Sequence, residues 1–268
     1  MARLLALLLC LTVWTTTAFA QDGLQQLNSR RDLLGWEGVG RLDLAGGAFC
    51  TGVLIDTSTV LTAAHCLYDP KTGAFRMPGD VTFRAGFQNG SVIAERAAAQ
   101  AVVDENYVYS AQGVITQFRN DIALITLDDP IPSATARPFA TATPNGGSVS
   151  VVSYGAGRLN ASSRERDCNT LVQGDGLVAL DCNGVPGSSG APVFTIDGSA
   201  IRIVSIIAGG ALDSGRSVSV GPFVHERLPE LRQALRAGRG IWDTDTPAAR
   251  TQRPGDPAST NRPGFIRP

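Results

Sequence analysis

Short runs of β-branched, aliphatic and aromatic residues, separated by turn-forming residues, recur along most of this chain and constrain its fold. Strands are expected at residues 49–55, 60–63, 81–87, 92–103, 122–127, 148–154, 170–172, 176–182, 191–196, 200–207 and 217–224. Regularly spaced short strands are typical of β-sandwiches and β-barrels. The sequence therefore predicts an all-β protein.

One helix is expected after the last strand, because Leu228, Leu231 and Leu235 form a helical i, i+3, i+7 stripe that starts near Pro229. A segment rich in Pro, Thr, Ala and Gly is expected to link two β-rich halves. A final segment rich in Pro and Arg is expected to be disordered. The expected parts are a first half (36–130), a linker (131–147), a second half (148–224), a C-terminal α-helix (225–237) and a tail (238–268).

The N-terminus has the pattern of an export signal. Arg3 precedes an apolar run at residues 4–13, and Ala18-Phe19-Ala20 forms a small-x-small cleavage site. The run is shorter than the roughly 20 residues that span a bilayer. We expect cleavage after Ala20 and a secreted or periplasmic protein without a membrane anchor. Residues 21–35 are expected to form a pro-segment or an N-terminal arm.

The chain carries 23 basic and 24 acidic side chains, so no nucleic-acid partner is expected. Removal of the signal takes Cys10 and leaves Cys50, Cys66, Cys168 and Cys182. Four cysteines in an exported chain suggest two disulfides, for which three pairings are possible. A metal site is the alternative, but there is no C-x-x-C pair and the chain has two histidines, so no metal or cofactor is expected.

The run Gly187-Ser188-Ser189-Gly190-Ala191-Pro192 presents a serine in a turn directly before an expected strand. The flanking glycines permit positive φ and let neighbouring N–H groups converge on one point, as an oxyanion-binding site requires. The same pattern also occurs in ordinary loops. Ser189 is therefore a candidate nucleophile that needs partners elsewhere in the chain.

Two residues earlier in the chain could be those partners. His65 ends an expected buried strand, and Asp121 directly precedes an apolar one. Taken singly, each has a structural interpretation, as a hydrogen-bonded histidine and as a turn-forming aspartate.

Together, Thr-Ala-Ala-His-Cys at 62–66, Asn-Asp-Ile-Ala-Leu at 120–124 and the serine run resemble the chymotrypsin-like (trypsin-like) serine proteases. The resemblance covers roughly residues 36–237. It implies two six-stranded antiparallel Greek-key β-barrels, followed by a C-terminal α-helix. It further implies a monomeric serine endopeptidase that acts on protein or peptide substrates.

The resemblance also assigns roles to individual residues. Ser189 would be the nucleophile, His65 the general acid and base, and Asp121 the carboxylate that orients the imidazole. The Gly187 and Ser189 amides would form the oxyanion hole, and Ser205 would support Asp121. The implied disulfides are Cys50–Cys66, beside the histidine, and Cys168–Cys182, beside the substrate pocket.

Some residues depart from the trypsin pattern. Ser188 stands where trypsin-like animal enzymes have an aspartate, and no Ile-Val-Gly-Gly start follows a processing site, so the pattern is closer to bacterial V8-like (glutamyl-endopeptidase-like) proteases. Asn183, six residues before Ser189, occupies the expected specificity position and carries no charge for a substrate Arg or Lys. The histidine associated with glutamate preference is absent from residues 202–208.

Two other classes of protein share parts of this pattern. α/β-Hydrolase esterases have the order Ser, Asp, His, whereas this chain has His65, Asp121, Ser189, and Ala191 breaks their Gly-x-Ser-x-Gly elbow. The second hypothesis is a catalytically silent, protease-like binding or adhesion module. Its usual marker would be a missing triad residue, and all three are present.

Overall fold

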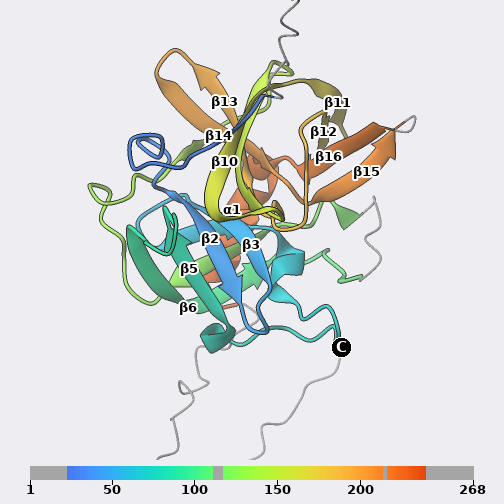
Figure 1. Cartoon of the computed structure of the whole chain (residues 1–268). Helices are drawn as coiled ribbons and strands as arrows, with labels where there is room; N and C mark the ends of the chain where they lie inside the picture. The colour runs from blue at the N-terminus through green and yellow to red at the C-terminus, as the bar shows by residue number, and fades with distance from the viewer. Residues whose placement is uncertain (1–22, 111–116, 214–215, 240–268) are drawn as a thin grey trace, which may run out of the picture.

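A computed structural model describes residues 23–110, 117–213 and 216–239. The predicted signal peptide and nearly all of the predicted tail lie outside these residues. Figure 1 shows two β-rich halves. The predicted fold class, all-β with one C-terminal helix, is confirmed.

The first half is a closed barrel with the strand order β2-β3-β4-β7-β6-β5. Its strands alternate in burial where one face meets solvent, as in β5, because successive side chains point to opposite faces. The interior is filled by Val53, Leu61, Phe83 and Leu124, all at most 1% exposed. The strands are β2 (Val39–Leu44), β3 (Phe49–Leu54), β4 (Thr59–Thr62), β5 (Val81–Ala85), β6 (Ala94–Val103) and β7 (Ala123–Leu127).

The second half is barrel-like and is built from two sheets in the described residues, with the orders β1-β10-β9-β13-β14-β8 and β11-β12-β16-β15. The six-stranded sheet contains β1 (Leu24–Gln26), β8 (Ala140–Thr141), β9 (Val149–Gly155), β10 (Arg158–Cys168), β13 (Pro192–Asp197) and β14 (Ala200–Ile206). The four-stranded sheet contains β11 (Thr170–Gly174), β12 (Leu177–Leu180), β15 (Gly209–Asp213) and β16 (Arg216–Pro222).

The segment expected to be a linker is packed against both halves. Its strand β8 pairs in parallel with β14. Ile131, Ala136 and Phe139 are buried, and all three belong to the largest apolar cluster. The connection therefore contributes to the core in addition to joining the halves.

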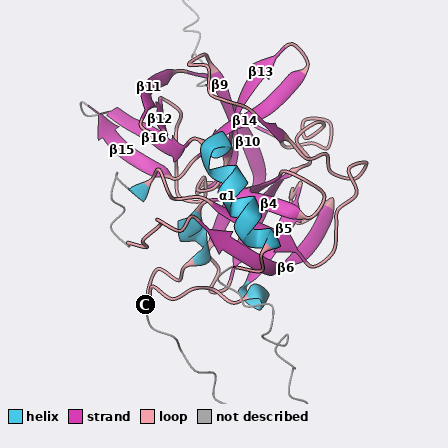
Figure 2. Cartoon of the chain, turned by 180° about the vertical axis from the view of Figure 1, so that it is seen from behind, coloured by secondary structure: helices cyan, strands magenta, loops and turns pink. Residues whose placement is uncertain are grey.

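The helix α1 (Val224–Arg236) lies where the leucine stripe predicts one, but it begins five residues before Pro229. A proline inside a helix removes one backbone hydrogen bond. Burial of Val224, Leu228 and Leu231 against the core compensates for this loss. Figure 2 shows α1 crossing the back of the molecule, where it contacts β6 and β7 of the first half and β14 of the second.

The N-terminal arm is part of the folded unit. Its strand β1 pairs with β10, with Leu24 opposite Glu165, and its Leu27 and Leu33 are 3% and 1% exposed. In the described part of the chain no helix is both long and apolar enough to cross a membrane.

Replacing Leu33 with alanine is expected to lower the free energy of unfolding by about 2–5 kcal/mol, because a buried side chain is lost and a cavity is left. The neighbouring Leu34 is 68% exposed, so Leu34→Ala is the matched control and should change stability by less than about 0.5 kcal/mol. Urea denaturation of both variants measures the difference. Equal stabilities would show that the arm does not contribute to the core.

Candidate active site

His65 and Asp121 meet because their strands are antiparallel neighbours. β4 pairs with β7, and Thr62 lies opposite Ala123. The chain leaving β4 therefore passes the chain entering β7 at the same end of the barrel. His65 follows in a short 3-10 helix, η1 (Ala64–Leu67), and Asp121 lies two residues before β7.

Both carboxylate oxygens of Asp121 bind His65. The imidazole Nδ1 lies 2.7 Å from Oδ2, and the His65 backbone N–H donates to Oδ1 at 2.9 Å. The aspartate side chain is 4% exposed, whereas the imidazole is 28% exposed. The pair thus fixes the ring and leaves one side of it open to solvent.

Burial alone would lower the pKa of His65, but the negative charge of Asp121 and its hydrogen bond to the ring outweigh this effect. The net result is a pKa above the ordinary value of 6.5. A base of this kind is matched to proton transfer near neutral pH.

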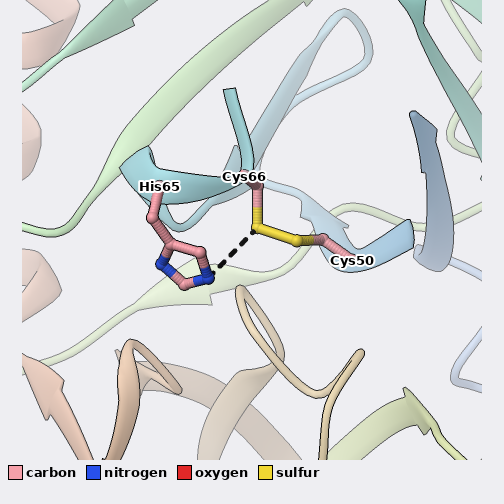
Figure 3. Close-up of side chains that lie close together, drawn as sticks. All are labelled: Cys50, His65 and Cys66. Atoms are coloured by element: carbon pink, nitrogen blue, oxygen red, sulfur yellow. Dashed lines mark hydrogen bonds between the residues drawn. A yellow bond between two sulfur atoms is a disulfide. The ribbon is translucent and has the colours of Figure 1, made fainter. Parts of the chain in front are cut away.

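The disulfide Cys50–Cys66 joins β3 to the residue after His65, as the family resemblance implied. Figure 3 shows the imidazole beside this bridge, with Nε2 directed toward Sγ of Cys66 at 3.8 Å. Although Cys50, His65 and Cys66 cluster closely enough to suggest metal ligands, the sulfurs are bonded to each other and are not thiolates.

Ser189 lies in the turn before β13 and lines the same cleft, of about 510 Å³, as His65 and Asp121. The structure describes no hydrogen bond between its hydroxyl and His65. In enzymes without substrate such catalytic hydrogen bonds are often long and tighten in the complex. The structure therefore joins two members of the predicted triad directly and places the third in the same cleft.

The amides of Gly187 and Ser189 are oriented by the carbonyl groups that precede them. The Ala156 N–H binds the Pro186 carbonyl at 2.7 Å, and the Ala191 N–H binds the Ser188 carbonyl at 2.9 Å. In a trans peptide the following N–H points the opposite way. Neither amide donates to another residue in the described part of the chain.

Glycine is required at two positions of this turn. Gly187 has φ +96°, and a Cβ there would lie 2.3 Å from the Phe49 ring. Gly190 has φ +77°, and a Cβ would lie 2.2 Å from both the Thr51 carbonyl oxygen and the Thr62 hydroxyl. The serine turn can therefore approach the first barrel only without side chains at these positions.

Thr51 is a residue that the sequence interpretation missed, and it connects the two halves. Its N–H donates to the Ser189 carbonyl at 2.8 Å, and its hydroxyl donates to the Gly187 carbonyl at 2.9 Å. The same hydroxyl accepts the Tyr154 N–H at 3.0 Å. Nothing in the local sequence distinguishes this threonine from an ordinary strand residue.

Replacing Thr51 with valine keeps the shape of the side chain and removes its hydroxyl. The Gly187 carbonyl and the Tyr154 N–H then lose a partner in a buried place, so we expect a loss of about 1–3 kcal/mol in the free energy of unfolding. Thr51→Ser keeps the hydroxyl and should lose less. Chemical denaturation of both variants tests this, and equal losses would contradict it.

Two other predicted site residues have different contacts from those expected. Ser205 is fully buried, but its hydroxyl donates to the Pro222 carbonyl at 2.7 Å and to no oxygen of Asp121. Asn183 is absent from the described lining of the cleft and binds Glu165. The predicted roles of Ser205 and Asn183 thus receive no support from these contacts.

The rest of the cleft is lined by aromatic and small residues together with the polar side chains of Arg76, Ser110 and Gln117. The aromatic residues are Phe49, Tyr68, Tyr107, Tyr109 and Phe118, and the small residues include Ala208, Gly209 and Gly210. Asp121 is the single carboxylate among the described lining residues, and it is occupied by His65.

The fold and this site define a chymotrypsin-like protein with a paired histidine and aspartate facing a serine turn. The chain belongs to the trypsin family of serine proteases, since the family model described as Trypsin matches residues 35–221.

Among curated proteins, the chain is 36% identical over 118 residues to "Serine protease SP24D" of Anopheles gambiae. The matched region covers 42% of this chain and 40% of that relative. The chain is 25% identical over 219 residues to "Trypsin zeta" of Drosophila erecta. This matched region covers 70% of this chain and 74% of the relative.

Solved structures share the fold. A Glu endopeptidase in complex with MPD superposes with a TM-score of 0.67 at 18% identity, over 81% of this chain and 98% of that one. A thermostable serine protease from an extremophilic microorganism gives a TM-score of 0.54 at 23% identity, over 70% and 91% of the two chains.

Proposed function

We propose that this protein is a serine endopeptidase in which Ser189, His65 and Asp121 act as a catalytic triad. The observation that carries the proposal is the buried Asp121 bound to His65 through both oxygens, in the same cleft as the serine turn. Family membership supports the reaction type. Retention of all three residues argues against the silent binding module.

The chemistry follows from the properties of each group. A serine hydroxyl is a weak nucleophile, so the neutral imidazole of His65 takes its proton as the oxygen attacks the substrate carbonyl. Asp121 holds the ring tautomer and stabilises the imidazolium, while the Gly187 and Ser189 amides bind the oxyanion. His65 then protonates the leaving amine, and water hydrolyses the acyl-enzyme by the same steps.

The proposed substrates carry a side chain other than Arg or Lys at the residue after which the chain is cut. The described cleft contains no unpaired carboxylate that could bind Arg or Lys. It also lacks a second histidine of the kind associated with glutamate preference in V8-like enzymes. We propose that the likeness to V8-like proteases is limited to the serine turn. There Ser188 stands in place of the aspartate that trypsin-like animal enzymes need after zymogen cleavage.

Ser188 is 2% exposed, and its hydroxyl lies 3.3 Å from the Tyr154 carbonyl and 3.4 Å from Ser153 Oγ. A buried ammonium group would find no charged partner in these contacts. We therefore propose activity without a new N-terminus inserted beside the serine turn. Export of the chain, with cleavage after Ala20, is part of the same proposal, and the two disulfides fit an oxidising compartment.

Secreted protein, with and without cleavage near Arg30-Arg31, can be treated with a fluorophosphonate probe and with a peptide library. We expect labelling at Ser189 in both forms, and cleavage after residues other than Arg and Lys. Well-folded protein that is neither labelled nor active would favour the binding module. Cleavage after Arg or Lys would contradict the proposed substrate class, and activity confined to the trimmed form would identify residues 21–30 as an inhibitory pro-segment.

A further inference from the structure

The serine turn is bound to the first barrel through Thr51, which donates to the Gly187 and Ser189 carbonyls, but the residues directly before the turn have no hydrogen bond to that barrel in the described part of the chain. Gly184 and Gly187 lie within four residues of each other, and glycine allows a wide range of backbone conformations. The Pro186 carbonyl, which sets the direction of the Gly187 amide, lies between them. Whatever fixes the chain at Asn183 therefore influences the orientation of that amide.

Glu165 of β10 is the group that binds Asn183. The backbone N–H of Asn183 donates to both carboxylate oxygens, at 3.1 and 2.9 Å. The Asn183 side-chain amide donates to Oε1 at 2.9 Å. Both oxygens are thus engaged by one residue, which leaves the Asn183 side chain directed at Glu165 and away from a substrate.

Glu165 is only 8% exposed, which is unusual for a carboxylate that forms no close ion pair in the described residues. It lies opposite Val151 of β9 and Leu24 of β1, and within 4.8 Å of both sulfurs of the Cys168–Cys182 bridge. Burial raises its pKa above 4.5, more than the Asn183 hydrogen bonds lower it.

Two further charged groups act on Glu165. Arg158 favours its ionised form, and Asp181 disfavours it. The guanidinium Nη1 of Arg158 is itself buried without a hydrogen-bond partner. A buried carboxylate in these surroundings is costly, and its hydrogen bonds in the described residues all come from Asn183, four residues before the serine turn.

We propose that Glu165 is a positioning residue for the proposed protease reaction: its buried carboxylate clamps Asn183, fixes the chain that leads into the serine turn, and thereby helps to orient the Gly187 amide. This rests on the proposed function. It also assigns Asn183 to the clamp and not to substrate selection, in place of the role predicted from the sequence.

Asn183→Asp distinguishes a substrate-facing role of Asn183 from its proposed role as the partner of Glu165, because the two roles predict opposite results. If position 183 faced the substrate, a carboxylate there would favour cleavage after Arg or Lys. In the clamp it meets Glu165 at hydrogen-bond distance, where two like charges repel. We expect kcat to fall about 100-fold for all peptides at pH 8, with a smaller change in KM, since misplacement by roughly 1 Å can cost about 10²-fold.

The pH dependence of the activity of Asn183→Asp distinguishes repulsion between the two carboxylates from general damage to the fold. Protonation of one carboxylate removes the repulsion, so kcat/KM of Asn183→Asp divided by that of wild type, at each pH, should rise as pH falls from 8 to 5. Taking this ratio cancels the titration of His65, which both proteins share. A flat ratio, or a new preference for Arg or Lys, would overturn the proposal.

Glu165→Gln tests the other partner, because its amide NH2 group would face an N–H donor. We expect kcat to fall about 10-fold, since the turn shifts only slightly. Glu230→Gln, on the exposed face of α1, is the matched control and should behave as wild type. If the wild type is active and Glu165→Gln has the same kcat as this control, the proposed role of Glu165 is refuted while the proposed function stands. If wild type hydrolyses no peptide, the proposed function fails and the clamp with it.

Discussion

Ser189→Ala is expected to lower kcat for peptide hydrolysis by about 10⁴- to 10⁶-fold, with little change in KM or in stability. The nucleophile is lost, while the cleft and the hydrogen bonds of the turn, which use backbone groups of Ser189, remain. Loss of the serine in other proteases with this triad has effects of this size, and the residual rate comes from binding and the oxyanion hole.

The measurement is steady-state kinetics with the best peptide found in the library, together with fluorophosphonate labelling. Ser188→Ala is the matched control, because it removes an adjacent hydroxyl outside the proposed chemistry; we expect its kcat to stay within about 10-fold of wild type. Retention of activity and labelling in Ser189→Ala would refute the proposed nucleophile. Equal losses in both variants would indicate damage to the turn and not the loss of a nucleophile.

Asp121→Asn is expected to lower kcat by about 10⁴-fold at neutral pH. The asparagine keeps the shape, but its amide can hold the imidazole in the wrong tautomer, with Nε2 protonated and unable to accept the serine proton. The imidazolium formed during the reaction also loses its counter-charge.

This variant has a pH signature. The wild-type kcat/KM should decrease as pH falls through the pKa of His65, which lies above 6.5, because protonated imidazole cannot act as a base. Asp121→Asn removes the charge that raises this pKa and leaves burial, which lowers it. The acidic decline should therefore move to lower pH. An unchanged profile would show that another group controls the activity.

The features that could be predicted from the sequence are those encoded by local pattern. Strand runs and the leucine stripe predicted the fold class because burial on one face imposes a period of 2 or 3.6 residues. The site was predicted because the runs around His65, Asp121 and Ser189 resemble, in this order, the motifs of the trypsin-like serine proteases. In the structure His65 and Asp121 meet because one follows β4 and the other precedes β7, and these two strands are neighbours.

What could not be predicted depends on register between distant strands. Thr51 meets the serine turn, and Glu165 meets Asn183, only because of how β3 and β10 are placed against other segments. Irregularities between Glu165 and Cys168, and between Val193 and Phe194, shift the pairing further. Ser205 is another example, because its hydroxyl donates to the Pro222 carbonyl, whereas the family resemblance implied that it supports Asp121.

The largest apolar cluster contains Leu61 and Leu124 of the first barrel together with Phe194, Ile203 and Leu231 of the second half and helix. A core shared in this way packs the two halves against each other. We therefore expect His65 and the serine turn to keep the separation that is set when the chain folds. The protein would meet its substrate preorganised, so that little reorganisation is needed as charge develops on the carbonyl oxygen.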